Sequence, residues 1–318
     1  MQLIIYIDKP KERIHILQDK NKHAYLIMCH TNFHQLNILL ELLDDARNDI
    51  YLHIDKKSNG FSAEQIQNHV SKAKIYFISP ITVGWGGDSQ IKAEVRLLRE
   101  AVKSKHQYYH LISGRDLPLK TQDELHRFFN EHSGTDFVAM ERNHPHNINK
   151  QFMERLEYYY IYQNRISNGD DDRAKSLVKK QEKCLTWQKK HHINRIKDTK
   201  IDFIKGCNWF SITHDAACYV LHNYKKFKSV FRYAYCAEEI FLQTILANSP
   251  FVNNIEDDCL RLIDWDRRES NAHPRIFREE DFELLTHAGE NKLFARKFDE
   301  KTDSIIIDKM YRYLKSQV

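Results

Sequence analysis

Apolar residues recur along the first half of the chain in two alternating patterns. Short apolar runs, which predict buried strands, cover 23–29, 50–55, 74–79, 108–113 and about 135–140. Between them, apolar positions spaced three and four residues apart predict helices over 33–48, 63–73, 89–104 and about 122–132. Strands and helices that alternate in this way are typical of an α/β fold with a mostly parallel central sheet flanked by helices.

The second half of the chain begins with a different pattern. Residues 153–200 are charged and aromatic, which predicts a helical insertion beside the functional site. After it we expect strands near 201–204 and 209–213 and helices over 215–224, 239–247 and 304–315. We therefore predict one domain over 23–318 and leave 1–22 unassigned.

Polar side chains gather directly after the predicted strands. In open α/β sheets, ligands bind beyond the carboxyl ends of the strands. The residues at these positions are His30 and Asn32, Asp55 and Lys56, the run 84–87 with Gly86, and the run 113–116 with Asp116. The sequence therefore predicts a binding site at this edge of the sheet.

Two adjacent acids, Glu238 and Glu239, begin a helix that is apolar on nearly all sides over 238–246. Such a helix is buried, and the partial positive charge at its N-terminus favours ionised carboxylates there. Either acid is thus a candidate general base. The alternative is a pair of first-turn glutamates with no catalytic role, and these nine residues alone favour that alternative.

Two adjacent cations, Arg296 and Lys297, lie between large apolar residues in the run 293–298. In a buried strand their side chains would point to opposite faces. A buried cation without an anion is costly, so a ligand phosphate or protein carboxylates must neutralise them, and both remain open. Arg275 and Arg278 precede this run and add positive charge.

Composition narrows the function classes. The 318 residues are 42% hydrophobic and 29% charged, as in an ordinary folded protein. The six cysteines form no CxxC pair, which is typical of reduced thiols. No run approaches the roughly 18 apolar residues that span a bilayer, and Met1–Asp8 does not resemble a signal peptide. We therefore expect a cytoplasmic protein.

Metal and nucleotide motifs are weak or missing. The spacings Asp264-Trp265-Asp266 and Asp170-Asp171-Asp172 offer paired carboxylates, but such triplets occur by chance. The flat ring of Trp265 suits stacking on a sugar or core packing. No zinc-ligand spacing, GxGxxG, Walker or GxSxG pattern occurs. We expect neither a metal nor another cofactor.

Positive charge is concentrated in one segment. Residues 173–200 contain ten Lys or Arg against Glu182 and Asp198, a local charge of +8, so that the rest of the chain, at a total of +5, carries −3. The segment suits an anionic membrane surface, nucleic acid phosphates or a solvated helix face. Because no nucleic-acid-binding module is present, we favour peripheral contact with a membrane.

Eight strings, taken in order, resemble glycosyltransferase family 14, the core-2/I-branching N-acetylglucosaminyltransferases and peptide O-xylosyltransferases. They are CHTNFHQL (29–36), LHIDKKS (52–58), GWGGDS (84–89), ISGRDLPL (112–119), KGCNWFSIT (205–213), AEEIFLQTIL (237–246), LRLIDW (260–265) and LFARKFD (293–299). The strings span most of residues 23–299.

The resemblance implies a GT-A-like fold, a UDP-sugar donor, and inversion of the anomeric carbon without a divalent metal. It places Glu239 on the catalytic base, Arg296 and Lys297 on the diphosphate cations, and Asp55 on the nucleoside contact. The other expected donor contacts are His30, Gly86 and Arg275. The expected acceptor contacts are Asp116, Asn208, Trp209, Trp265 and Glu238, and Asn208 departs from the residue that relatives often have.

The implied function is transfer of a sugar to a hydroxyl of a glycan acceptor. N-acetylglucosamine is the first candidate donor sugar and xylose the second, with glucose and galactose open. The animal enzymes carry a Golgi membrane anchor and disulfides. We expect neither in this protein, which favours a bacterial-type enzyme acting on a cytosolic, lipid-linked glycan of a surface polysaccharide. The alternatives are a non-catalytic nucleotide- or carbohydrate-binding protein and a nucleic-acid-binding protein.

Overall fold

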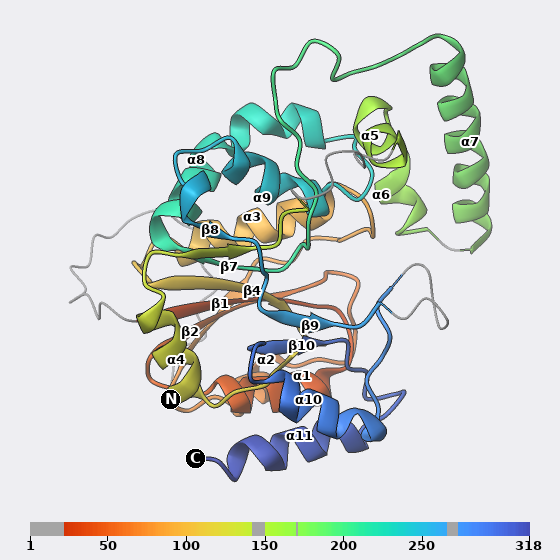
Figure 1. Ribbon diagram of the computed structural model, residues 1–318. Helices are drawn as coiled ribbons and strands as arrows, with labels where there is room; N and C mark the ends of the chain where they lie inside the picture. The colour runs from red at the N-terminus through yellow and green to blue at the C-terminus, as the bar shows by residue number, and fades with distance from the viewer. Residues whose placement is uncertain (1–21, 142–149, 170, 266–272) are drawn as a thin grey trace.

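The computed structural model describes residues 22–141, 150–169, 171–265 and 273–318. Within them, seven strands form a central sheet in the order β3-β2-β1-β4-β7-β6-β8 (Figure 1). Their bounds are β1 His23–Cys29, β2 Asn48–Ile54, β3 Lys74–Ile78, β4 Tyr108–Ser113, β6 Asp136–Val138, β7 Phe210–Thr213 and β8 Ile255–Glu256.

The sheet is mostly parallel, as predicted. Strand β1 pairs in parallel with β2 and β4, and β2 pairs in parallel with β3. Strand β7 is antiparallel to both β4 and β6, so it alone runs against the others in the described sheet. All seven residues of β2 are buried, which is expected of a strand covered on both faces.

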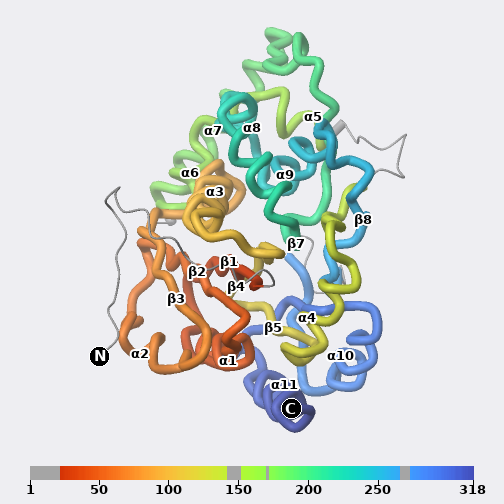
Figure 2. The backbone as a smooth tube through the Cα atoms, turned by 90° about the vertical axis from the view of Figure 1, so that its left-hand side faces the viewer, coloured from red at the N-terminus to blue at the C-terminus, as the bar shows by residue number. Residues whose placement is uncertain are grey.

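Helices cover both faces of the sheet (Figures 1 and 2). On one face lie α1 (Phe33–Leu43), α2 (Ala63–Gln67), α4 (Gln122–Glu131), α10 (Phe282–Ala288) and α11 (Ile305–Lys315). On the other lie α3 (Ser89–Ala101), α8 (His214–Phe231) and α9 (Glu238–Ala247). Alternate residues of β1 enter different cores, since Tyr25 and Ile27 pack toward α1 and Ala24 and Leu26 toward α3.

A second, three-stranded sheet was not predicted. It has the order β5-β10-β9, with β5 at Leu117–Pro118, β9 at Arg261–Ile263 and β10 at Phe294–Arg296. Short 3-10 helices precede β8 (Val252–Asn254) and α10 (Glu279–Asp281). The buried strand considered for the run 293–298 is present as β10, but it ends at Arg296 and does not include Lys297.

The strand predicted near 201–204 is absent from the structure. These residues form no regular element, because their backbone amides and carbonyls hydrogen-bond to side chains of α9 and of its C-cap Asn248 and not to another strand. The amide of Ile204 donates to Thr244 Oγ1 (3.2 Å), and that of Gly206 donates to the carbonyl of Glu239 (2.9 Å). A Cβ at Gly206 would lie 1.8 Å from the carbonyl oxygen of Ala139, so the close approach requires glycine.

The predicted helical insertion is confirmed up to Lys190. It comprises α5 (Lys150–Glu157), α6 (Gln163–Ile166) and α7 (Asp171–Lys190), while 191–200 contain turns and no helix. Two buried glutamines of α7 hold it to the tyrosine run before α6. Gln181 accepts from the amide of Tyr162 (3.0 Å) and Gln188 from that of Tyr159 (2.8 Å). Most of the other described α7 side chains are exposed.

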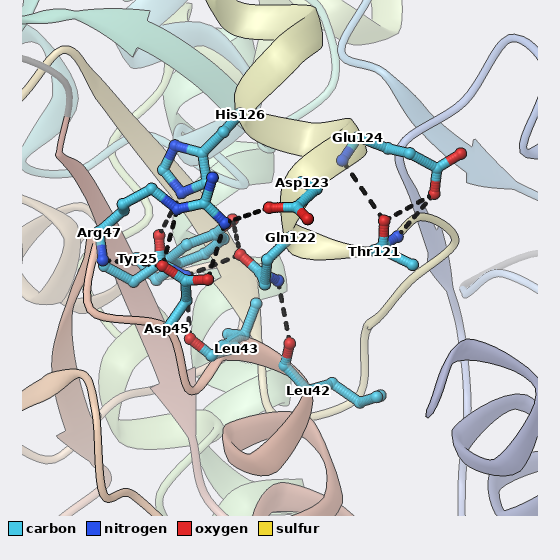
Figure 3. A network of polar contacts seen from close by, with 11 residues as sticks. Tyr25, Leu42, Leu43, Asp45, Arg47, Thr121, Gln122, Asp123, Glu124 and His126 are labelled. Atoms are coloured by element: carbon cyan, nitrogen blue, oxygen red, sulfur yellow. Dashed lines mark hydrogen bonds and ion pairs between the residues drawn. The ribbon is translucent and has the colours of Figure 1, made fainter. Parts of the chain in front are cut away.

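Local polar contacts fix the start of α4 (Figure 3). Thr121 and Glu124 form a capping box, in which each side chain accepts from the other residue's backbone amide. Such a cap contributes about 1 kcal/mol to helix stability. Arg47 bridges Asp45 and Asp123, which ties the loop after α1 to the same helix end.

Some predictions fall outside the described residues. These are the segment 1–21, Asp170 and Asp266, and the single domain over 23–318 stays a prediction. No helix that the structure describes is both long enough and apolar enough to span a bilayer.

Candidate functional site

A pocket of about 1110 Å³ opens at the carboxyl ends of the parallel strands. It brings together most of the predicted site residues, although they come from segments far apart in the sequence. Those that line it are His30, Asp55, Asn208, Trp209, Glu238, Glu239, Trp265, Arg296 and Lys297. The pocket lies at the edge of the sheet where the strand ends predict a binding site, and binding there stays a prediction.

Glu239 lies in the first turn of α9 and is partly exposed in the pocket. Its Oε2 accepts a hydrogen bond from Arg155 Nη1 at 2.8 Å. This contact with Arg155 positions the Glu239 carboxylate at the pocket wall, and a carboxylate so placed is a candidate general base. Arg155, on α5, was missed in the sequence because a single arginine in a charged insertion carries no distinguishing signal.

Glu238 is the neighbour of Glu239 but has very different surroundings. It is 6% exposed, and no described group hydrogen-bonds its Oε2. Burial raises the pKa of its carboxyl to about 8, and the charge of Glu239 adds to this effect. Glu238 therefore favours its protonated form near neutral pH, whereas Glu239 is hydrogen-bonded to Arg155.

A third acid, Glu94 on α3, lies behind the pocket and was also missed. The Asn208 amide is assigned with its nitrogen donating to Glu94 Oε1 and to the carbonyl of Glu238, both at 3.1 Å, since this orientation satisfies both acceptors. Burial, followed by the charge of Glu238, raises the pKa of Glu94 well above its usual value. Asn208 thus bridges two buried acids.

Arg296 is held from two sides at the end of β10. Its Nη1 donates to Asp116 Oδ1 at 2.9 Å, and its guanidinium lies 4.0 Å from the ring centroid of Trp209. Of the two neutralising groups left open by the sequence, a protein carboxylate is therefore present for Arg296, namely Asp116. Asp116 is fully buried and lies outside the pocket lining, so it orients Arg296 and does not face the pocket.

Lys297 follows the strand and lines the same pocket as Arg296. The expectation that the two point to opposite faces is wrong, because β10 ends at Arg296 and its alternation stops there. No described carboxylate pairs with Lys297, and the nearby Arg115 is itself paired with Asp299. Burial, followed by the charges of Arg115 and Arg296, lowers the pKa of Lys297 to about 8. An anionic ligand beside Lys297 would stabilise the charged form of its amine.

The residues after β1 and β2 form another wall of the pocket. Asp55 is 6% exposed and accepts from the backbone amides of Lys57 (2.9 Å) and Val83 (3.2 Å). His30 lies nearby, and burial followed by the charge of Arg115 lowers its pKa. Two tryptophans at the pocket, Trp85 and Trp265, are each 55% exposed, and their free faces suit stacking on a sugar ring.

Two further predicted donor contacts lie outside the lining. Gly86 has φ 67° and a Cβ there would lie 2.9 Å from the Tyr235 ring, so glycine serves the turn itself. Arg275 is engaged by Asp264 (2.8 Å) and Asp281 (2.7 Å). The donor roles of Gly86 and Arg275 stay predictions, and their described contacts are with protein groups.

A sequence model described as Core-2/I-Branching enzyme matches residues 23–288, most of the chain. The chain belongs to the Core-2/I-Branching enzyme family. This membership agrees with the resemblance of the eight strings. The mostly parallel sheet flanked by helices agrees with the GT-A-like fold that this resemblance implies.

The named relatives of this chain are distant in sequence. Rat xylosyltransferase 2 is 22% identical over 308 residues, which cover 90% of this chain and 33% of the relative. Human xylosyltransferase 1 is 22% identical over 318 residues, covering 92% and 30%. The chain therefore spans about a third of the length of these curated relatives.

Solved structures give weaker matches. Mouse xyloside xylosyltransferase 1 has a TM-score of 0.38 at 10% identity, covering 86% of this chain and 96% of that one. Core-mannan synthase A from Aspergillus fumigatus has a TM-score of 0.36 at 12% identity, covering 79% and 80%.

Of the carboxylates considered for a metal, the structure describes the side chains of Asp264 and Asp172. In the described part of this Core-2/I-Branching enzyme, no three His, Cys, Asp or Glu side chains come together as metal ligands do. Asp264 is paired with Arg275, and the Asp172 side chain is fully exposed on α7. Whether the reaction needs a metal is a separate question that an assay decides.

The surroundings of Glu238 predict a pH-dependent stability. Its pKa is raised from 4.5 to about 8 in the folded chain, so folding takes up a proton between these two pH values. The free energy of unfolding therefore decreases as the pH rises from about 4.5 to about 8. Glu238→Gln removes the titration. We expect the variant to gain stability relative to the wild type between about pH 5 and 8, by up to about 1.4 kcal/mol per pH unit.

Urea denaturation at several pH values measures this difference. Glu256→Gln, at an exposed glutamate of β8, is the matched control and should show no such trend. Parallel pH profiles for Glu238→Gln and the wild type would contradict the buried, proton-bearing state.

Proposed function

We propose that the chain is an inverting, metal-independent glycosyltransferase that uses a UDP-sugar. The observation that supports this is one pocket lined by both Glu239 and the cations Arg296 and Lys297. Glu239 takes the proton of an acceptor hydroxyl as its oxygen attacks C1 of the sugar. The two cations stabilise the charge that develops on the departing UDP, and so act mainly in the transition state.

The donor sugar has two candidates. N-acetylglucosamine follows from the family's branching enzymes, and xylose is supported by the distant xylosyltransferase relatives. We propose a glycan acceptor, lipid-linked and belonging to a bacterial surface polysaccharide, which stacks on the exposed rings of Trp85 and Trp265. We also propose that the enzyme acts in the cytoplasm.

A panel of UDP-sugars tests both the activity and its metal independence. We expect the purified protein to release UDP from one of them, with UDP-N-acetylglucosamine and UDP-xylose compared directly, and to keep its rate in excess EDTA. A strict requirement for Mn²⁺ would contradict the cation mechanism. Binding of UDP without release from any donor would favour the alternative of a non-catalytic nucleotide-binding protein.

Removing the proposed base should abolish transfer but leave the nucleotide in place. Glu239→Gln keeps the shape of the side chain and cannot accept the proton, so we expect the turnover rate to fall by about 10² to 10⁴. Calorimetry should find the affinity for UDP within a few-fold of the wild type. Glu141→Gln, at an exposed acid on the pocket rim, is the control for loss of one negative charge. Turnover of Glu239→Gln at the wild-type rate would remove it from the role.

The unpaired cation should govern affinity for UDP. A charge-assisted contact contributes about 1.5 to 3 kcal/mol, so Lys297→Ala is expected to weaken UDP binding roughly 10- to 100-fold. Because the pKa of Lys297 is about 8 in the empty pocket, wild-type affinity should also fall as the pH rises above 8, where the free side chain loses its proton. Binding is then linked to proton uptake.

Calorimetry with UDP over this pH range makes the measurement. Lys301→Ala removes an exposed lysine from the same segment and should leave both the affinity and its pH dependence unchanged. Equal affinities for Lys297→Ala and the wild type would refute a contact with the diphosphate.

We further propose that α7 makes peripheral contact with an anionic membrane. Lys179, Lys180 and Lys183 are exposed and have no ion-pair partner among the described residues. Trp187 on the same helix is 56% exposed, and an exposed aromatic ring suits the headgroup region. Figure 1 shows α7 at the periphery, beyond α5 and α6. Contact of α7 with a membrane would bring the enzyme close to an acceptor that is attached to a lipid.

Vesicle sedimentation tests the contact. Each basic residue at an anionic surface contributes on the order of 1 kcal/mol, so replacing the three lysines by alanine should weaken binding to phosphatidylserine vesicles roughly a hundredfold. The same replacement at the exposed Lys225, Lys226 and Lys228 of α8 is the charge-matched control. Equal losses for the two triple variants would contradict a specific role for α7.

A further inference from the structure

A second pocket lies where α3 packs on β2 and on the edge strand β3 (Figure 2). Its volume is about 380 Å³, near the lower end of the range for small-molecule sites. It shares no lining residue with the pocket that holds Glu239 and Lys297, called the transfer pocket below. The proposed transfer therefore makes no use of this second pocket.

The C-terminal half of α3 brings three cations to the second pocket, namely Arg96, Arg99 and Lys103. Arg96 and Arg99 are three residues apart on the helix, so their side chains lie on one face. Lys103 forms an ion pair with Glu100 at 2.5 Å. Neither arginine forms an ion pair with a carboxylate that the structure describes. Both are exposed, so a ligand can reach them.

The helix dipole accounts for only part of this positive charge. The negative end of the dipole stabilises cations in the last turn of a helix, and Arg99 lies in the last turn of α3. Arg96 lies before that turn, where the effect has fallen off. The Arg99 guanidinium also lies 5.6 Å from the ring centroid of Tyr224, a contact that orients it and adds no negative charge. The pocket thus keeps a positive charge that the described residues do not neutralise.

Aromatic rings from the sheet form another wall of the second pocket. Tyr51 and Tyr76 are partners in the register of β2 and β3, and their rings stack with centroids 4.8 Å apart. Tyr51 is 3% exposed, whereas Tyr76 is half-buried. The pair therefore offers a fixed, largely apolar wall for the uncharged part of a ligand. The hydroxyls of Ser79 and Ser104 add possible hydrogen-bond donors at the same pocket.

We propose that the second pocket binds a small phosphate monoester, with its phosphate on Arg96 and Arg99 and its organic group against Tyr76. A phosphate monoester carries nearly two negative charges at neutral pH, which matches two guanidinium groups, whereas a carboxylate carries one. The planar fork of arginine also suits phosphate oxygens. A pocket of this volume has room for a group such as a sugar beside the phosphate. The site does not rest on the proposed function.

Calorimetry on the purified full chain tests the class of ligand. The probes are glucose 1-phosphate, inorganic phosphate and acetate, with excess UDP present to engage the transfer pocket. We expect glucose 1-phosphate to bind most tightly, because it has both the charge and an organic group, and acetate to bind least. Equal affinities for glucose 1-phosphate and inorganic phosphate would overturn the assignment to an ester. Acetate binding as tightly as phosphate would overturn the assignment to a dianion.

A pair of double variants tests the residues. Arg96→Gln/Arg99→Gln retains good helix formers and removes both charges, so the affinity for glucose 1-phosphate should fall at least roughly tenfold. Arg127→Gln/Arg312→Gln removes two exposed arginines of α4 and α11. It is the charge-matched control and should bind as the wild type does. Circular dichroism confirms folding of both variants. Equal losses in the two would show attraction to the overall charge of the protein and overturn the site.

Arginine labelling with phenylglyoxal, measured by mass spectrometry in the absence of UDP, locates the bound probe. We expect glucose 1-phosphate to protect Arg96 and Arg99 and to leave Arg127 as reactive as before. Protection of Arg296 alone would place the ester in the transfer pocket and overturn the proposal. If UDP fails to bind, the proposed function fails, while protection of Arg96 and Arg99 still decides the phosphate site.

Discussion

The buried guanidinium of Arg261 joins the two sheets, and the geometry of the site depends on it. Its nitrogens donate to the carbonyl of Leu111 in β4, and to the carbonyl of Phe210 and the hydroxyl of Ser211 in β7. Because β9 pairs with β10, the same contacts set the position of Arg296 at the end of β10. The small sheet therefore carries its cations to the edge where the large sheet presents its strand ends. A buried charge is retained here in place of an apolar contact, which gives the junction a defined orientation.

This junction brings opposite charges into one pocket from separate elements. Helix α9 presents acids at its N-terminus, where the helix dipole favours them. Strand β10 presents cations whose neutralisation within the protein is incomplete, since Asp116 pairs with Arg296 and no described carboxylate pairs with Lys297. In the proposed reaction, the anionic donor completes the cation side and the hydroxyl of a separate acceptor completes the acid side. This complementarity, rather than any single motif, is what links the fold to sugar transfer.

The sequence predicted those parts of the structure whose pattern is local. Alternating periodicity identified the parallel strands and their helices, and the rule for strand ends located the pocket. The rest depends on contacts between distant segments. Residues 201–204 have the apolar pattern of a strand, but α9 takes up their hydrogen bonds. The partners Arg155 and Glu94 were missed because a charged residue on a helix shows no local sign of what it will meet in the fold.

The acid pair shows how surroundings divide two adjacent residues of the same type. Both glutamates occupy the first turn of α9, so the dipole acts on each, and sequence alone does not separate a helix-start preference from catalysis. The fold separates them by solvation and partners. Glu238 is enclosed with Glu94 and Asn208 and favours its protonated form, whereas Glu239 faces the pocket and is paired with Arg155. Burial thus favours a proton on Glu238, while Glu239 lies open to the pocket, and this difference in surroundings is why the proposed transfer uses Glu239, and not its neighbour, as the acceptor of a proton.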